Sequence, residues 1–286
     1  MSLLTDTNPS TATLDFPELK YDPAELPKAT TDRTRAKADL DRWGYCLIAG
    51  ALTPEQVKTA RDRLAAVAKA EREDGVAGMF DEGESQTVAA LINKGQPFID
   101  LVEHELAVEM MEYLLGEKFL LSNTAALIKG PGGPAQVVHA DQGFMPEPWH
   151  FPCSANVMWM LDDFIEVAGA TRVVPGSHRL NRNPPGGDFT KPETLNKGPK
   201  VKAPVAIEGP AGTAMVFEGR LWHCGGGNRT NDYYRHGLLT YYCKGMFRTQ
   251  ENWFRSLSPH VLKDASPTLR RLLGYEQYSV LGAVSR

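Results

Sequence analysis

A histidine and an aspartate lie two residues apart in the segment VVHADQG, as His139 and Asp141. Residues i and i+2 of a β-strand point to the same face, so these side chains are expected to lie side by side. An imidazole nitrogen and a carboxylate oxygen together suit a first-row divalent metal ion. Two ligands hold such an ion weakly, and a histidine inside a β-barrel also occurs as an ordinary core residue. The pair therefore predicts a metal site only if the chain supplies a third ligand.

The strongest candidate for a third ligand is His223. It ends the run TAMVFEGRLWHCGGG, which predicts one apolar strand that stops at three glycines and brings an imidazole to the mouth of a barrel. His236, beyond the next turn, is the alternative. Four other histidines fit less well, because they lie in a predicted helix, a proline-rich loop, a turn and a polar C-terminal segment: His104, His150, His178 and His260. Two histidines and one carboxylate form the facial triad of non-haem Fe(II) oxygenases, which leaves coordination positions open for a co-substrate and O2.

The composition of the 286-residue chain is that of a globular protein. A formal net charge of −4 argues against nucleic acid as a partner, because its phosphates need a basic surface. No apolar run approaches the roughly 18 residues that span a bilayer, and the N-terminus lacks the features of a signal peptide. The four cysteines are scattered, which is typical of a reducing compartment. We therefore expect a cytoplasmic protein that binds a small-molecule substrate, and neither nucleic acid nor a membrane.

Helices are predicted before the β-rich part of the chain. A short polar helix is expected from about residue 31, followed by a strand over 44–48. In ALTPEQVKTARDRLAAVAKAEREDG, Thr53 and Gln56 form a capping box, and apolar residues recur at helical spacing up to Gly75. Residues 76–95 are expected to form a loop. The segments EHELAVEMMEYLLG and SPTLRRLLGY predict two further helices, the second of them in the C-terminal tail.

The residue pattern of the sequence changes beyond Phe119. Short runs rich in Val, Leu, Trp, Tyr and Thr alternate with turns such as GPGGP, PGSH and CGGGN. This pattern predicts antiparallel β-structure in a sandwich or barrel. The predicted fold class is mainly β with flanking helices, around a jelly-roll core at about residues 119–250. Residues 1–30 are expected to form an N-terminal arm, and residues 31–286 a single domain.

Several stretches, in this order, resemble one enzyme family: DRWGYCLIAGALTPEQV, HADQGFMPEPWHFP, LDDFIEVAGATRVVPGSHR, WHCGGGNRTNDYYRHG and SLSPHVL with SPTLRRLLGY. They cover roughly residues 36–276. The chain is similar to the phytanoyl-CoA dioxygenase (PhyH-like) family of Fe(II)/2-oxoglutarate-dependent oxygenases. The resemblance implies a double-stranded β-helix, which agrees with the strand pattern. It also implies that His139, Asp141 and His223 are the catalytic iron ligands, with Fe(II) as cofactor and 2-oxoglutarate and O2 as co-substrates.

2-Oxoglutarate needs a cation for its distal carboxylate, and arginine suits it because its planar guanidinium grips a carboxylate through two parallel hydrogen bonds. Arg235, in YYRHGLLTYYCKG, would lie on the strand beside the one that ends at His223. The resemblance points to the same residue, although the preceding turn is about one residue longer than in the family, which leaves Arg229 as an alternative. Lys129 is a further cation, but we expect it to be solvated at a strand end.

Two more co-substrate residues come from the resemblance alone. Gln136 and Thr171 match a glutamine and a threonine with which relatives that make fungal natural products hold 2-oxoglutarate. Gln136 lies three residues before His139, so a regular strand would turn it to the opposite face unless a bulge intervenes. Asp141 is informative as well, because related halogenases have a small residue at this position. Its presence disfavours chlorination.

The substrate pocket is expected to be lined by aromatic and methionine side chains, namely Phe80, Phe144, Met145, Trp149 and Tyr241. Tyr241 would share the face of Arg235, because the spacing between them is even. Packing in the core is the alternative role for each of these residues. The lining suits an apolar substrate body, and the chain has no concentrated Lys/Arg cluster for the phosphates of coenzyme A.

The resemblance therefore predicts an enzyme that oxidises an unactivated C–H bond of a small hydrophobic metabolite, such as a natural product. The reaction would be a hydroxylation, a desaturation or a related oxidation, with release of succinate and CO2. An acyl-CoA hydroxylase of the same family, a Zn-dependent hydrolase and a non-catalytic binding barrel stay open as alternatives. Relatives often pair, so a homodimer is the oligomeric state that the resemblance suggests.

Overall fold

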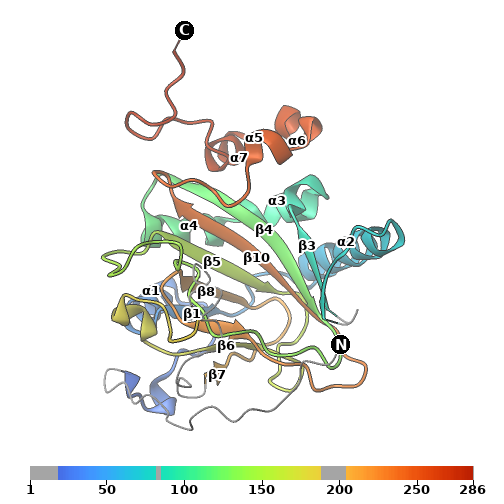
Figure 1. Cartoon of the computed structure of the whole chain (residues 1–286), viewed down its shortest axis with the longest axis vertical. Coiled ribbons are helices and arrows are strands. Elements are labelled where there is room, and N and C mark those ends of the chain that lie inside the picture. Colours follow the sequence, from blue (N-terminus) through green and yellow to red (C-terminus); the bar gives the residue numbers. More distant parts are fainter. Residues whose placement is uncertain (1–18, 82–84, 188–203, 286) are drawn as a thin grey trace.

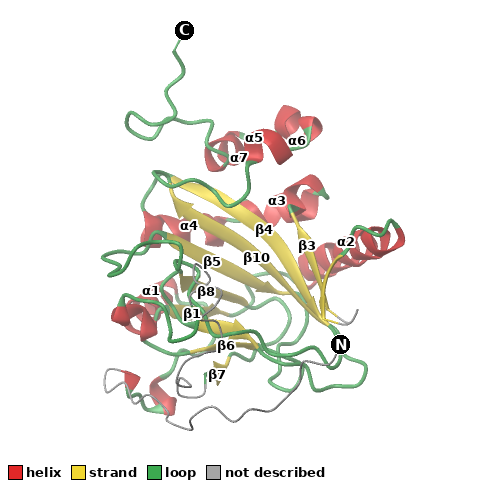
Figure 2. Ribbon diagram, viewed as in Figure 1, coloured by secondary structure: helices red, strands yellow, loops and turns green. Residues whose placement is uncertain are grey.

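Two antiparallel sheets form the centre of the computed structural model, which describes residues 19–81, 85–187 and 204–285 without the side chains of Phe80 and Asp81 (Figure 1). The larger sheet has seven strands in the order β1-β8-β5-β10-β4-β3-β2. The smaller sheet has three strands in the order β7-β6-β9. Helices cover one face of the large sheet, and the small sheet packs against its other face (Figure 2).

The strands of the large sheet are β1 (Tyr45–Ile48), β2 (Gly78–Asp81), β3 (Ser85–Ala89), β4 (Phe119–Lys129), β5 (Ser154–Met160), β8 (Ala214–Glu218) and β10 (Arg235–Lys244). Those of the small sheet are β6 (Thr171–Val173), β7 (Val205–Ala206) and β9 (His223–Gly225). The α-helices are α1 (Arg33–Trp43), α2 (Pro54–Glu73), α3 (Gln96–Val102), α4 (Glu105–Leu115), α5 (Trp253–Ser256), α6 (Pro259–Asp264) and α7 (Pro267–Leu272). Short 3-10 turns occur at η2 (Pro23–Glu25), η3 (Leu91–Asn93) and η4 (Ser177–Leu180).

Alternating side chains of the central strands fill two separate cores. In β5, Val157 and Trp159 pack on the helical side, whereas Met158 and Met160 pack between the two sheets. Because both faces of β5 are covered, all seven of its residues are buried. Leu238 of β10 also belongs to the helical side. The odd-numbered residues of β10, which begin with Arg235, therefore face the space between the sheets.

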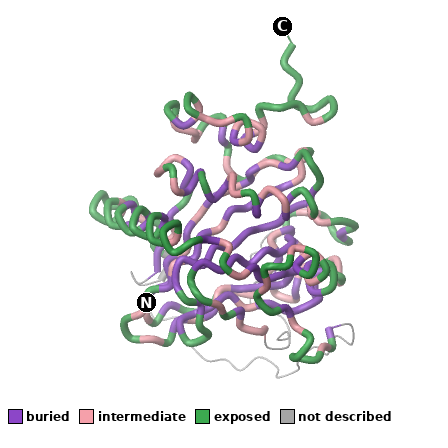
Figure 3. The backbone as a smooth tube through the Cα atoms, turned by 180° about the vertical axis from the view of Figure 1, so that it is seen from behind, coloured by how far each residue is buried: buried purple, intermediate pink, exposed green. Residues whose placement is uncertain are grey.

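The N-terminal helices form as predicted. Helix α1 begins after Asp32, whose carboxylate accepts hydrogen bonds from two backbone N–H groups of the first turn, and it ends at Gly44 with a φ of 81°. Helix α2 has the predicted capping box between Thr53 and Gln56. Its outer face is exposed (Figure 3). The helices predicted at EHELAVEMMEYLLG and SPTLRRLLGY are confirmed as α4 and α7.

The prediction of a loop over residues 76–95 is wrong. Strands β2 and β3 pair there and extend the large sheet beyond β4. The sequence pattern does not indicate a strand here, because β3 has polar residues that are nevertheless buried and hydrogen-bonded. The Ser85 hydroxyl accepts from the backbone of Gly130, and the Gln86 amide donates to the carbonyl of Ala68.

The run TAMVFEGRLWHCGGG is not one strand, as the sequence pattern predicts, but two strands in different sheets. β8 ends at Glu218, and the chain turns at Gly219 and Arg220 before β9 begins at His223. A Cβ at Gly219 would lie 2.0 Å from the Ser154 hydroxyl, so only glycine fits this turn. The turn moves His223 from the large sheet to the small one.

The C-terminal helices lie at one end of the large sheet, and the last residues extend away from the body (Figures 1 and 3). Trp253 anchors α5 by donating from its indole N–H to the carbonyl of Leu121. Within the described residues, no helix combines the length and the apolar character that a membrane crossing requires.

Candidate metal centre

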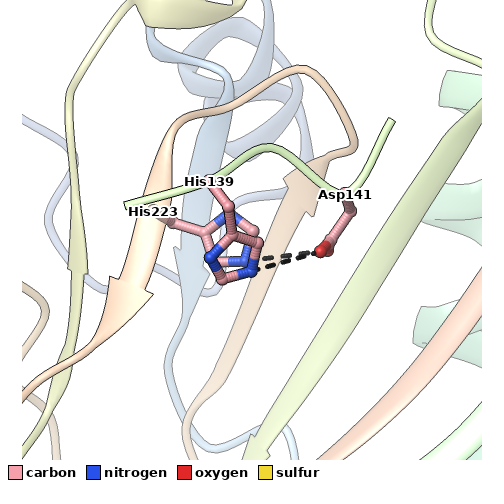
Figure 4. Close-up of side chains that lie close together, drawn as sticks. All are labelled: His139, Asp141 and His223. Carbon is pink, nitrogen blue, oxygen red and sulfur yellow. Dashed lines mark ion pairs between the residues drawn. The ribbon is translucent and has the colours of Figure 1, made fainter. Parts of the chain in front are cut away.

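His139, Asp141 and His223 meet in the space between the two sheets. The backbones of the two histidines exchange hydrogen bonds of 2.9 and 2.8 Å, which brings their ring centroids to 4.4 Å. Figure 4 shows both imidazoles turned toward the carboxylate of Asp141. The Nε2 atoms of His139 and His223 lie 3.6 and 3.7 Å from its two oxygens. One ligand atom of each residue therefore lies within 4.8 Å of the others, a spacing that suits a shared metal ion.

The segment that carries His139 is not the regular strand that the two-residue spacing predicts. His139 forms an isolated bridge with His223, and Asp141 begins a turn. The two side chains still meet, because the bridge fixes His139 and the turn brings Asp141 back toward it.

Each histidine is oriented by a carbonyl oxygen two residues before it. Nδ1 of His139 lies 2.8 Å from the carbonyl oxygen of Val137, and Nδ1 of His223 lies 3.0 Å from that of Leu221. A proton on Nδ1 of the neutral ring donates to that carbonyl and leaves the lone pair on Nε2. Both lone pairs then face the carboxylate of Asp141, as metal ligation requires.

Asp141 is held from two strands of the large sheet. Its Oδ2 accepts a hydrogen bond of 2.6 Å from the amide of Asn156 on β5, and its carbonyl accepts one of 3.2 Å from the hydroxyl of Tyr241 on β10. Burial favours the neutral acid, but His223, His139 and the Asn156 amide outweigh it and hold the pKa of Asp141 below its ordinary value. The carboxylate is thus ionised and fixed in direction before any ligand binds.

The two imidazoles differ in their electrostatics. Burial lowers the pKa of His223, so its ring is neutral at pH 7. Burial acts on His139 in the same direction, but the Asp141 carboxylate outweighs it and raises the pKa of His139. Any proton that Nε2 of His139 holds must leave when a divalent cation binds.

Arg235 is buried, with 2% of its surface exposed, and faces the space between the sheets. The prediction that it lies on the strand beside that of His223 is wrong, because β10 pairs with β4 and β5 in the large sheet and β9 belongs to the small one. Its guanidinium lies over the ring of Phe164, 4.5 Å from the centroid. Burial lowers its pKa to about 10, although Asp162 opposes this, so the group is cationic at neutral pH. Its Nε and Nη1 atoms have no hydrogen-bond partner among the described residues. A buried cation with free N–H groups is costly unless an anion completes it.

Lys129 lies opposite Arg235 in the pairing of β4 with β10. The expectation of a solvated lysine is wrong, because Lys129 is buried and its ammonium donates to the carbonyl of Pro134. Arg229, the alternative to Arg235, is exposed. Of the arginines considered, Arg235 is therefore the one that is both buried and free to bind a carboxylate.

Gln136 and Thr171 both contact Gly225, one from each side. Thr171 is buried and pairs with Gly225 in the small sheet. The backbone N–H of Gln136 donates to the carbonyl of Gly225 at 2.9 Å, and its side-chain oxygen accepts from the N–H of Gly225 at 2.8 Å. Both residues thus flank β9, two positions after His223. Their proposed role toward 2-oxoglutarate stays a prediction.

Among the predicted substrate residues, Tyr241 lines a cavity of about 120 Å³ beside Asp141. Phe144 is exposed and meets the ring of Phe247 edge-on, with 6.5 Å between centroids. Trp149 packs in a small cluster that includes Trp222, and Met145 lies against the same cluster. The side chain of Phe80 lies outside the described residues. For these five residues, substrate contact stays a prediction.

Asn156 is not predicted from the sequence as a site residue, although its side chain orients Asp141. A signal existed, because it is a carboxamide in the otherwise apolar run SANVMWM. His236, the alternative metal ligand, faces the helical side of the sheet. There its Nδ1 lies 2.6 Å from the carboxylate of Asp162, away from Asp141.

Residues 40–237 match the model of the phytanoyl-CoA dioxygenase (PhyH) family. The chain belongs to this family. Among curated relatives of this PhyH protein, Dioxygenase af480 of Aspergillus fumigatus is 29% identical over 249 residues, which are 85% of this chain and 77% of the relative. Dioxygenase FrzG of Cladobotryum sp is 27% identical over 270 residues, which are 85% of each chain.

Solved structures with the same fold include the carbocyclase SnoK from nogalamycin biosynthesis, at a TM-score of 0.60 and 20% identity over 83% of this chain and 93% of that one. HygX of Streptomyces hygroscopicus, solved with nickel and 2-oxoglutarate bound, has a TM-score of 0.60 and 15% identity over 76% of this chain and 89% of that one. The predicted fold, a double-stranded β-helix with flanking helices, is confirmed by this likeness. The predicted enzyme class, a dioxygenase, is confirmed by the family.

Proposed function

We propose that this PhyH protein is an Fe(II)/2-oxoglutarate-dependent dioxygenase in which His139, Asp141 and His223 hold the metal. The observation that carries the proposal is the convergence of these side chains, with both Nε2 lone pairs aimed at one ionised carboxylate. Two imidazoles and one carboxylate suit Fe(II) and leave coordination positions free. Bound iron supplies the oxidation of a C–H bond by O2, coupled to the conversion of 2-oxoglutarate to succinate and CO2.

The buried guanidinium of Arg235 fits the distal carboxylate of 2-oxoglutarate. Two of its nitrogen atoms are buried and have no partner in the part of the chain that the structure describes, and the guanidinium lies over the ring of Phe164. An incoming carboxylate would satisfy both nitrogens through charge-assisted hydrogen bonds. Gln136 and Thr171, which flank β9 two positions after the metal ligand His223, are proposed to contact the same molecule.

The residues around the metal ligands position them rather than react. Asn156 and Tyr241 hold Asp141 on both of its polar sides, and the carbonyl groups of Val137 and Leu221 hold the imidazoles. Such partners keep ligands in the orientation that the metal needs. Burial of the centre between two sheets limits the access of water, which protects a reactive centre from side reactions.

The substrate is proposed to be a small, largely apolar metabolite, and the structural likeness to a carbocyclase from nogalamycin biosynthesis supports a natural product. The four cysteines are unpaired and buried, which supports a cytoplasmic location. A Zn-dependent hydrolase would leave the free guanidinium of Arg235 without a role. An acyl-CoA substrate would need several free cations for its phosphates. Three cations line the groove near the C-terminus, but Lys118 and Arg271 already donate to backbone carbonyl groups, which leaves Arg248 for a phosphate.

Anaerobic titration of the metal-free protein tests the proposal. Fe(II) followed by 2-oxoglutarate should produce the weak visible charge-transfer band of chelated iron. Asp141→Ala should weaken or abolish the band, and Arg235→Ala should raise the 2-oxoglutarate concentration needed to form it. Two matched controls are His260→Ala, an exposed histidine on α6, and Arg229→Ala, an exposed arginine near Arg235. The absence of a band in folded, iron-loaded protein would overturn the proposal.

A further inference from the structure

Asn228 lies in the turn between β9 and β10, five residues after the metal ligand His223 and seven before Arg235. It is buried, with 2% of its surface exposed. A buried carboxamide needs partners for its polar atoms, and this one uses both its donor and its acceptor capacity in full. Its role follows from the chain segments that these hydrogen bonds join.

The nitrogen of the carboxamide holds the backbone from which Arg235 projects. Nδ2 of Asn228 donates to the carbonyl of Tyr233 at 2.7 Å, two residues before Arg235. It also donates to the carbonyl of Lys129 at 3.1 Å. Lys129 is the residue opposite Arg235 in the pairing of β4 with β10. One amide group therefore ties the start of β10 and the end of β4 to the turn.

The oxygen of the same carboxamide closes the turn. Oδ1 of Asn228 accepts from the backbone N–H of Thr230 at 2.9 Å and from its hydroxyl at 2.6 Å. Because a carbonyl only accepts and a backbone N–H only donates, these partners fix which end of the amide is the nitrogen. The four hydrogen bonds hold the link between the metal ligand on β9 and the arginine on β10 in one shape.

Two further segments meet the backbone of Asn228. Its N–H donates to the carbonyl of Gly133 at 2.9 Å, three residues before Gln136. It also forms an isolated bridge with Ala168, three residues before Thr171. The predicted co-substrate residues thus lie on three chain segments that all contact Asn228: Gln136, Thr171 and Arg235.

We infer that Asn228 is a positioning residue of the 2-oxoglutarate site. It sets the place of the buried cation Arg235 relative to the metal ligand His223, and a small dicarboxylate can contact the metal and the guanidinium together only if that spacing is kept. A supporting residue must hold binding groups within a narrow range, because misplacement by about 1 Å can cost about 100-fold. The inference rests on the proposed function, in which 2-oxoglutarate lies between the metal and Arg235.

The metal ligands are supported independently of this turn. The backbones of His139 and His223 bond to each other, and Asp141 is held by side chains of the large sheet. Loss of the Asn228 side chain should therefore weaken the binding of 2-oxoglutarate and leave the binding of metal nearly unchanged. A residue that only stabilises the fold would not produce this difference.

Asn228→Ala tests the inference in anaerobic titrations. The substitution removes all four side-chain hydrogen bonds and adds no charge. We expect the 2-oxoglutarate concentration at half of the maximal charge-transfer band to rise about tenfold, while the Fe(II) concentration needed to load the protein changes by less than about twofold. Thermal unfolding of the same samples reports the loss of stability separately.

Asn93→Ala is the matched control. Asn93, in η3, also joins distant segments, because its Nδ2 donates to the carbonyl of Ser256 and its Oδ1 accepts from the N–H of Ser258, both at 2.8 Å. Neither partner belongs to a segment that contacts Asn228. The control should lower the unfolding temperature and bind 2-oxoglutarate as the unaltered protein does.

Thr230→Val is a milder second variant. It keeps the shape of the side chain and removes the hydroxyl that donates to Asn228. Thr230 is only partly buried, so this variant should fold even if Asn228→Ala does not. We expect the 2-oxoglutarate concentration at half of the maximal band to rise about threefold, which corresponds to the loss of one hydrogen bond.

Three outcomes would overturn the inference: unchanged 2-oxoglutarate binding in the folded variants of Asn228 and Thr230, an equal loss of 2-oxoglutarate and Fe(II) binding, or the same loss of 2-oxoglutarate binding in Asn93→Ala. A missing band in the unaltered protein would overturn the proposed function and the inference with it. A normal band that the substitutions do not shift would overturn the inference alone, so the two failures are distinguishable.

Discussion

A Cβ atom on Gly237 would lie 2.9 Å from Nη1 of Arg235, so the guanidinium lies in space that any other residue at position 237 would fill. The same Cβ would approach Met158 and Phe164 equally closely. Arg235 and Gly237 are two positions apart on β10 and share the face toward the small sheet. The glycine thus lets the arginine fold along its own strand, over the ring of Phe164.

Gly237→Ala should therefore weaken the binding of 2-oxoglutarate more than the binding of metal. We expect the apparent affinity for 2-oxoglutarate to fall about tenfold, with an overpacking cost of about 1–3 kcal/mol in the free energy of unfolding. Anaerobic titration of the iron-loaded variant measures the first effect, and denaturant unfolding measures the second. Gly78→Ala, which crowds β2 in a similar way near Thr87, is the control. Equal loss of affinity in both variants would show that Gly237 has no special relation to Arg235.

Asp162 fixes the start of β10 from the opposite face. Its Oδ2 accepts from the backbone N–H of His236 at 2.8 Å and lies 2.6 Å from Nδ1 of the same residue. Its Oδ1 lies 3.0 Å from Nε of Arg61 on α2. Since His236 follows Arg235 directly, these contacts hold the backbone from which the guanidinium projects.

Asp162→Asn should destabilise the protein and also weaken 2-oxoglutarate binding. An amide keeps one accepting oxygen where the carboxylate has two, so either the N–H groups of His236 or Arg61 loses its partner, at a cost of about 1–3 kcal/mol in the free energy of unfolding. We expect the KM for 2-oxoglutarate to rise several-fold while kcat at saturation changes little. Asp163→Asn, at the exposed neighbouring position, is the matched control. If the stability falls and the KM does not change, Asp162 has a structural role only.

The sequence predicts the metal site better than the strands that carry it. His139, Asp141 and His223 are recognisable because their residue types and order are those of a known ligand set. The turn between β8 and β9 cannot be recognised in the sequence, because apolar residues continue on both sides of it. Only the contact of Gly219 with Ser154, which the sequence does not show, explains why β8 ends there. Local periodicity cannot report a contact between residues that lie far apart in the chain.

Buried polar residues account for most of the other differences between the predicted and the observed structure. Lys129 and Gln86 have polar side chains and are predicted in solvated or loop positions, yet each is buried with a partner from another element. The side chains of Asn123 and Gln250 form a hydrogen bond across 127 residues of the chain, and such a pairing carries no local signal. The inward direction of Arg235 agrees with the alternation of side chains along its strand, but the pairing of that strand with β5 is a long-range contact that the alternation does not predict.

Asn156→Ala should weaken metal binding without removing a metal ligand. The substitution removes the 2.6 Å hydrogen bond to Asp141, and loss of such a partner typically lowers metal affinity about 10- to 100-fold. The amide favours the ionised carboxylate, so its loss should raise the pKa of Asp141. Protons then compete with the metal at higher pH, and the loss of affinity should grow as the pH falls. Titration with Fe(II) under anaerobic conditions at several pH values measures this, with Asn252→Ala, an exposed asparagine, as the control. An equal loss at every pH would contradict the electrostatic explanation.

Trp149 tests the packing beside the metal ligands. Its indole is buried against the cluster that contains Trp222, and its N–H donates to the carbonyl of Met145 at 3.0 Å. We expect Trp149→Ala to cost about 3–5 kcal/mol in the free energy of unfolding, as large cavities in a core do. Trp149→Phe should recover part of that loss, because it restores ring packing but not the hydrogen bond. If Trp149 only packs in this cluster, variants that stay folded should form the charge-transfer band with Fe(II) and 2-oxoglutarate as the unaltered protein does. A folded variant that loses the band would instead show that the cluster, which includes Ala140 and Trp222, holds the neighbouring metal ligands in place.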